Sequence, residues 1–157
     1  MSYDNDLYST IEKIYKKDDH VIVIFQVGLG GALGAISRYL LATYIESLGY
    51  NNQVSIFVVN ILGALVAGFC ITTLELNVES KFFQTFFIVG FLASFTTFST
   101  IAVATDQLFI RGQYLIGLMN ITGNIFFGLL AGLIGVLAAR AITVSYTHLT
   151  LPTIYSV

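Results

Sequence analysis

The residues of this sequence that can carry chemistry are polar side chains embedded in strongly apolar segments. They are one arginine, three asparagines and a run of hydroxyl residues, namely Arg38, Asn60, Ser94, Thr96, Thr97, Ser99, Thr100, Asn120 and Asn124. An unpaired polar group is costly in hydrocarbon, so each needs a partner in protein, water or a bound ion. Amides and hydroxyls can replace the hydration shell of an ion, which makes this pattern typical of an ion pathway. Hydrogen bonds between membrane helices use the same residue types, so that interpretation stays open.

Two of these residues have alternative interpretations. Arg38 either extends to the membrane interface as an anchor or attracts an anion. Asn60 lies in mid-segment, where its amide either joins two helices or donates hydrogen bonds to an ion. Asn120 and Asn124 are four residues apart, so they share one helix face and suggest a polar track.

Other kinds of chemistry lack the residues that they require. The chain has nine acids, none in the middle of an apolar segment, and these are Asp4, Asp6, Glu12, Asp18, Asp19, Glu46, Glu75, Glu79 and Asp106. Proton-coupled exporters usually place a carboxylate at that depth, so this class is disfavoured. The sequence shows no nucleophile–base pair, no metal-ligand cluster and no basic patch, which disfavours an enzyme and a nucleic-acid-binding protein.

The elements that must position these residues are membrane-spanning helices. Of the 157 residues, 56% are hydrophobic and only 10% are charged, whereas soluble domains carry about 25% charged residues. A helix needs about 20 apolar residues to cross a bilayer. Four segments meet this requirement, at residues 21–44, 54–74, 82 to about 105, and 114 to about 142. We therefore predict an all-α membrane protein with four transmembrane helices.

The third segment is expected to be broken at residues 90–100, which read GFLASFTTFST. A break frees backbone carbonyl groups, which suit a cation, as in the discontinuous helices of transporters. Phe98 follows closely, and the positive edge of its ring suits an anion. A purely structural kink remains the alternative. Small residues at helical spacing, such as Gly30 and Gly34, predict closely packed helices and an oligomer.

The two ends of the chain differ from the middle. Residues 1–20 are polar and of mixed charge, and we expect a short amphipathic or disordered tail before a transmembrane domain at 21–143. Residues 144–157 read VSYTHLTLPTIYSV, and the codons for VSYTHLTLPT match the transposon end used in sequencing libraries. We expect this segment to be a translated adapter, in which case His148 has no function and the natural C-terminus is missing.

Three segments together carry a resemblance to a known family. They are GGALGAISRYL at 30–40, VVNILGALVAGF at 58–69 and GFLASFTTFST at 90–100. In this order, within four spans, they resemble the Fluc (CrcB) fluoride channels over residues 27–130. The resemblance implies a passive fluoride channel of the cell membrane, not an enzyme, which exports cytoplasmic fluoride and reduces its toxicity. It also implies an antiparallel dimer with two pores.

The resemblance assigns roles to particular residues. It implies a structural sodium ion (Na+) held by the backbone carbonyls of Ala93 and Thr96. Asn60 matches the pore asparagine and Phe98 the first pore phenylalanine. Further residues expected on the fluoride path, or at its vestibule in the case of Arg38, are Ser99, Thr100, Asn120, Asn124 and Arg38.

Three departures from the family pattern, at four positions, put one pore in doubt. Ile101 replaces the second pore phenylalanine, Ala104 a frequent glutamate, and Asn120 and Asn124 the usual tyrosine and serine. Ile101 has no aromatic edge, so one pore is expected to be weak or silent. The alternative function is a non-conducting partner that completes a heterodimeric channel.

Charge placement predicts the orientation. Five basic residues (Lys13, Lys16, Lys17, Lys81 and Arg140) lie on the side of the termini, and only Arg111 lies on the other. Both termini are therefore expected in the cytoplasm. Without the N-terminal tail, two basic residues on the side of the termini stand against one on the other side, and this difference is too small to predict the orientation. The partner is either an oppositely oriented copy or a paralogous subunit.

Overall fold

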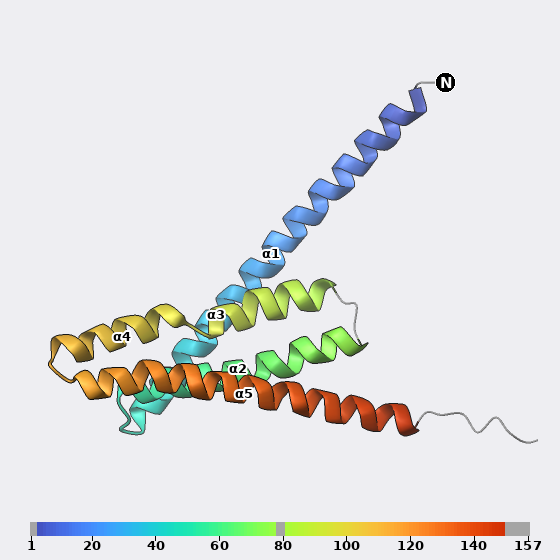
Figure 1. Ribbon diagram of the computed structural model, residues 1–157. Coiled ribbons are helices and arrows are strands. Elements are labelled where there is room, and N and C mark those ends of the chain that lie inside the picture. The colour runs from blue at the N-terminus through green and yellow to red at the C-terminus, as the bar shows by residue number, and fades with distance from the viewer. Residues whose placement is uncertain (1–2, 78–80, 150–157) are drawn as a thin grey trace, which may run out of the picture.

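The computed structural model describes residues 3–77 and 81–149, with side chains at 20–74 and 81–142. Every described element is helical: α1 (Tyr3–Ser47), α2 (Asn52–Asn77), the π-helix η1 (Phe83–Leu92), α3 (Ala93–Phe95), α4 (Phe98–Ile110) and α5 (Tyr114–Leu149) (Figure 1). Four stretches are long and apolar enough to cross a membrane, at His20–Ser47, Asn52–Leu74, Phe83–Ile110 and Tyr114–Ile142. The predicted all-α, four-span class is confirmed. With four crossings, both ends of the described chain lie on the same side of the bilayer.

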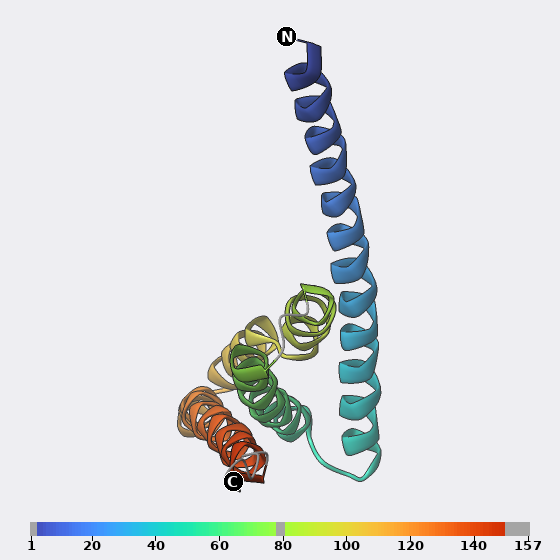
Figure 2. The ribbon, with the colours of Figure 1, turned by 90° about the vertical axis from the view of Figure 1, so that its right-hand side faces the viewer.

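Helix α2 occupies the centre of the bundle. It packs along α5 and also contacts α1, η1, α3 and α4, while α1 packs mainly against η1 and α3. Figure 2 shows this arrangement, with α1 on one side and α2 beside α5 on the other. The third span is therefore held between the first span and the α2–α5 pair.

Helices extend into both of the predicted terminal segments, the tail at residues 1–20 and the adapter at 144–157. Helix α1 begins at Tyr3 and projects beyond the other helices before its apolar part starts near His20 (Figure 2). Helix α5 continues to Leu149, and residues 150–157 lie outside the described part of the chain. The origin of residues 144–157 therefore stays a prediction.

Small residues allow the helices to approach closely, as predicted. A Cβ atom on Gly30 or Gly34 of α1 would overlap the backbone carbonyl groups of Phe86 or Phe91 in η1. Gly68 and Gly135 make an equivalent close approach between α2 and α5. Backbone atoms cannot move aside as flexible side chains do, so only glycine fits these positions.

The half-helix before the break is a π-helix with a ladder of phenylalanine rings. Phe83, Phe87, Phe91 and Phe95 stack in sequence, with ring centroids 5.0, 5.3 and 5.9 Å apart. π-helical segments are rare in proteins, and those that occur are often found at functional sites. The ladder ends at Phe95, directly before the break.

Candidate functional site

The break in the third span is two residues long. After Phe95, the backbone is extended at Thr96 (φ −86°, ψ 155°) and Thr97 (φ −153°, ψ 121°), and α4 begins at Phe98. Thr97 is the N-cap of α4, because its hydroxyl oxygen accepts a hydrogen bond from the amide of Thr100 at 3.4 Å. The predicted break is confirmed.

Hydroxyl groups surround this N-cap. The Thr97 hydroxyl lies 3.0 Å from the Ser99 hydroxyl and 3.2 Å from that of Thr100. Thr97 is not among the residues that the sequence places on the fluoride path. The signal was present, since a threonine directly before a helical segment is a common N-cap.

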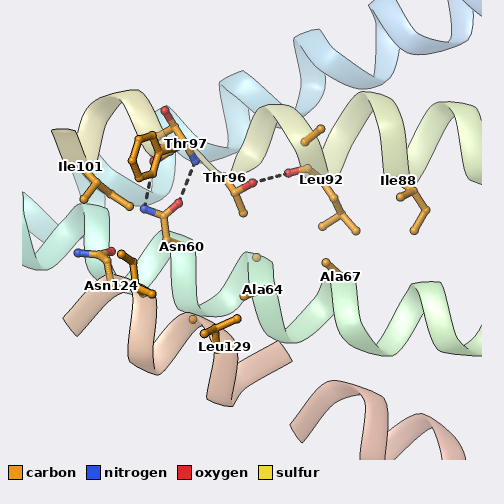
Figure 3. A pocket seen from close by; sticks show the side chains of 15 residues that line it. Asn60, Ala64, Ala67, Ile88, Leu92, Thr96, Thr97, Ile101, Asn124 and Leu129 are labelled. Carbon is orange, nitrogen blue, oxygen red and sulfur yellow. Dashed lines mark hydrogen bonds between the residues drawn. The ribbon is translucent and has the colours of Figure 1, made fainter. Parts of the chain in front are cut away.

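The side chain of Asn60 in α2 forms hydrogen bonds with the backbone at the break. The Thr97 amide donates to Asn60 Oδ1 at 2.9 Å, and Asn60 Nδ2 donates to the Thr97 carbonyl at 3.4 Å (Figure 3). The side chain is only 9% exposed. Asn60 therefore joins two helices, the first of its two predicted roles. Its Nδ2 carries a second N–H group, so the role of donor to an ion stays compatible with this geometry.

The hydrogen bonds at the break free two particular carbonyl groups. In a continuous helix, the amide of Thr97 would donate to the carbonyl of Ala93 and that of Thr100 to the carbonyl of Thr96. Here the two amides donate to the side chains of Asn60 and Thr97 instead. The carbonyls of Ala93 and Thr96 thus lose their helical donors, and carbonyl oxygens are suitable ligands for a hard cation.

Arg38 of α1 approaches the same end of the half-helix. Its Nε donates to the carbonyl of Ser94 at 3.2 Å. Carbonyl groups at a helix C-terminus carry partial negative charge, so a guanidinium group is favourable there. The side chain of Arg38 reaches inward to the break.

Two cavities meet at the break, and Thr97 lines both. The larger, of about 500 Å³, also contains Asn60, Ala93, Thr96, Phe98, Ile101 and Asn124 (Figure 3). The smaller, of about 290 Å³, contains Arg38 and Thr100. Phe98 is 67% exposed, so its ring is accessible from outside the monomer. Seven of the nine predicted site residues therefore line these two spaces at the break, whereas Ser99 and Asn120 line neither.

Asn120 and Asn124 share one face of α5, as predicted, but their donors are directed into the protein. Asn120 Nδ2 donates to the Thr105 hydroxyl at 2.9 Å, and Asn124 Nδ2 donates to the Asn120 carbonyl at 2.7 Å. Asn124 is 5% exposed, and its Oδ1 is buried with no hydrogen-bond partner. The unpartnered group of Asn124 in this arrangement is thus a hydrogen-bond acceptor, which suits a donor group better than an anion.

The two departures in α4 lie in one apolar cluster. Ile101 and Ala104 are buried with Ile56 of α2, and Ile121 of α5 packs against them. Ala104 is 2% exposed, so a glutamate there would not fit this packing unchanged. Ile101 also lines the larger cavity.

These features define a class of protein: a multi-pass membrane protein in which a broken helix presents polar groups at the depth of the bilayer. Within the described residues no group of three or more His, Cys, Asp or Glu side chains is placed to hold a metal.

The chain belongs to the CrcB family. The family model described as "CrcB-like protein, Camphor Resistance (CrcB)" matches residues 25–136.

Curated relatives support this assignment. The chain is 39% identical over 119 residues to "Fluoride-specific ion channel FluC 3" of Streptomyces avermitilis, covering 75% of this chain and 58% of that protein. It is 36% identical over 104 residues to "Fluoride-specific ion channel FluC" of Nitratiruptor sp., covering 66% and 80%. It is 34% identical over 124 residues to the protein of the same name from Ruminiclostridium cellulolyticum, covering 78% and 95%. The chain thus spans somewhat over half of the Streptomyces protein and most of the other two.

Proposed function

We propose that this chain is a subunit of a passive, fluoride-selective channel that exports cytoplasmic fluoride and so reduces its toxicity. The observation that carries the proposal is the polar break at Asn60 and Thr97, in a chain of a family whose relatives are named fluoride-specific channels. These relatives are named as channels and not as enzymes. The alternative of a non-conducting partner is not favoured, because the relatives carry the name of channels.

The chain supplies donors that can replace the hydration shell of fluoride. These are the second N–H of Asn60, the hydroxyls of Ser99 and Thr100, and the edge of the exposed Phe98 ring. Arg38, which lines the adjoining cavity, adds positive potential. A passive pathway lets the negative-inside membrane potential drive the trapped anion out of the cell.

The carbonyls of Ala93 and Thr96 fit a structural sodium ion. Both have lost their helical amide donors, and both residues line the larger cavity. When bound, sodium would supply positive charge that holds the broken ends together. Two carbonyls from one chain are too few ligands for a cation of this kind, which favours a second chain that brings its own.

The pathway is tested by fluoride efflux from liposomes that contain this protein alone, read with a fluoride electrode. We expect rapid fluoride efflux and chloride efflux at least about a hundredfold slower, because the donors are few and placed for a small anion. Chloride efflux at a similar rate from folded protein would contradict fluoride selectivity.

The same measurement distinguishes the two forms of the dimer. Efflux from the protein alone indicates an antiparallel homodimer in which Ile101 is tolerated. Efflux that appears only after a paralogous subunit is added indicates a heterodimer. Five basic residues on the side of the termini, against Arg111 on the other, favour cytoplasmic termini, and a chain of fixed orientation needs an oppositely oriented paralogue.

Replacing sodium with N-methylglucamine during purification is expected to convert dimers to monomers. The freed carbonyls of Ala93 and Thr96 would then meet at the dimer centre with no cation between them. Size-exclusion chromatography with light scattering measures the dimer fraction. An unchanged dimer fraction in sodium-free buffer, with potassium and lithium also excluded, would contradict the sodium site.

A further inference from the structure

We propose that Glu46 sets the rate of anion entry from the α1–α2 end of the channel, by opposing the attraction of Arg38 within one cavity. The inference rests on the proposed fluoride pathway and adds a residue to it. Three observations carry it: the shared cavity, the hydrogen bond that holds the carboxylate, and the position of Thr97.

The smaller cavity brings both charges into one space. Arg38 and Glu46 of α1 line it together with Asn52 of α2 and with Thr97 and Thr100 at the break. Arg38 is half-buried and donates to the Ser94 carbonyl, so the cation lies at the inner end of this space, beside the break. Glu46 is exposed and lies in the last turn of α1, at the outer end. An ion that enters from this side passes the carboxylate before it reaches the guanidinium group.

A buried serine holds the carboxylate in place. Ser55 of α2 is 0% exposed, and its hydroxyl donates to Glu46 Oε1 at 2.8 Å. The same hydroxyl oxygen lies 2.9 Å from the Asn52 carbonyl. A hydrogen bond to a charged acceptor is among the stronger ones in proteins. Glu46 is therefore a positioned charge and not a freely moving surface side chain.

The cavity lies next to the fluoride donors at Thr97. This residue lines both cavities and is bonded to Asn60. Field lines concentrate in a polar cleft with apolar walls, so a fixed charge at its mouth changes the local concentration of anions. Arg38 raises that concentration and Glu46 lowers it. Tyr39 also lines the cavity, and Asp106 and Arg111, near the α4–α5 turn, do not.

The test compares fluoride efflux of the wild type and Glu46→Gln in liposomes at low and high ionic strength. Glutamine keeps an oxygen that accepts from Ser55, so the fold is preserved. We expect about threefold faster efflux at 0.01 M impermeant salt and a difference close to zero at 1 M, because the Debye length falls from about 30 Å to about 3 Å. Asp106→Asn is the matched control, since it removes an exposed carboxylate on the same side of the bilayer.

A second variant separates charge from shape. In a Cys70→Ala background, Glu46→Cys is modified with a cationic or an anionic methanethiosulfonate of similar size. The cationic group is expected to accelerate efflux and the anionic group to slow it. Equal effects of the two reagents, or a Glu46→Gln rate equal to the wild type at low salt, would overturn the role of Glu46 while wild-type efflux still supports the channel. Absence of wild-type efflux both from the protein alone and after a paralogous subunit is added would overturn both.

Discussion

Replacing Asn60 with alanine is expected to abolish fluoride efflux and to lower the free energy of unfolding by about 2 kcal/mol. The substitution leaves the amide and the carbonyl of Thr97 without their partner at the break. Water cannot replace that partner easily, because Asn60 is largely buried. The same change removes the N–H group that we place on the fluoride path. Liposome efflux and thermal unfolding in detergent measure the two effects separately.

A matched control for Asn60 lies on the same helix. The hydroxyl of Thr73 donates to the Phe69 carbonyl within α2 at 2.8 Å. Thr73→Val removes this bond but leaves the helical backbone pairing intact, so we expect the efflux of the wild type and a small change in stability. Wild-type efflux and an unchanged melting temperature for Asn60→Ala would contradict the assigned role of Asn60.

The second large effect is expected for Gly34→Ala in α1. The added methyl group would overlap the backbone carbonyl of Phe91 in η1, and the backbone cannot move aside without displacing the half-helix. Overpacking of this kind costs about 1–3 kcal/mol. A displaced η1 also separates Arg38 from the Ser94 carbonyl, so efflux is expected to fall at least about tenfold along with stability.

Gly28→Ala provides the comparison for this prediction. Gly28 lies in the same helix, and a Cβ atom there would meet nothing within 4 Å. The melting temperature and the efflux of Gly28→Ala are expected to match those of the wild type. Gly34→Ala is expected to elute as a broadened or aggregated peak in size-exclusion chromatography. Similar behaviour of the two variants would show that the α1–η1 contact is not closely packed.

Much of the fold could be predicted from the sequence, because the signals are local. A membrane span needs a long apolar run, and four such runs are visible in the chain. The hydroxyl residues at 90–100 predict the broken third helix, because polar groups within the hydrocarbon core need hydrogen-bond partners and a break supplies them. The spacing of Gly30 and Gly34 likewise indicates a close helix contact. These features depend on neighbouring residues and on the solvent and require no knowledge of distant partners.

The partners of the polar groups were decided only by the tertiary structure. The hydrogen bonds between Asn60 and Thr97 join residues 37 positions apart, and hydropathy contains no information on such a pairing. The direction of the Asn124 amide depends on its hydrogen bond to the Asn120 carbonyl, one turn earlier in α5.

Two further features also follow from packing between helices. Ile101 and Ala104 looked like losses from a pore motif, and the structure places them in one apolar cluster with Ile56. Glu46 has no assigned role in the sequence, and the fold places it in the cavity of Arg38. The sequence by itself determined which segments enter the membrane and where the third one breaks, because burial of apolar surface and backbone pairing act locally. Only the packing of the helices decided which polar groups meet at that break, because hydrogen bonds are short and directional and their partners lie far apart along the chain.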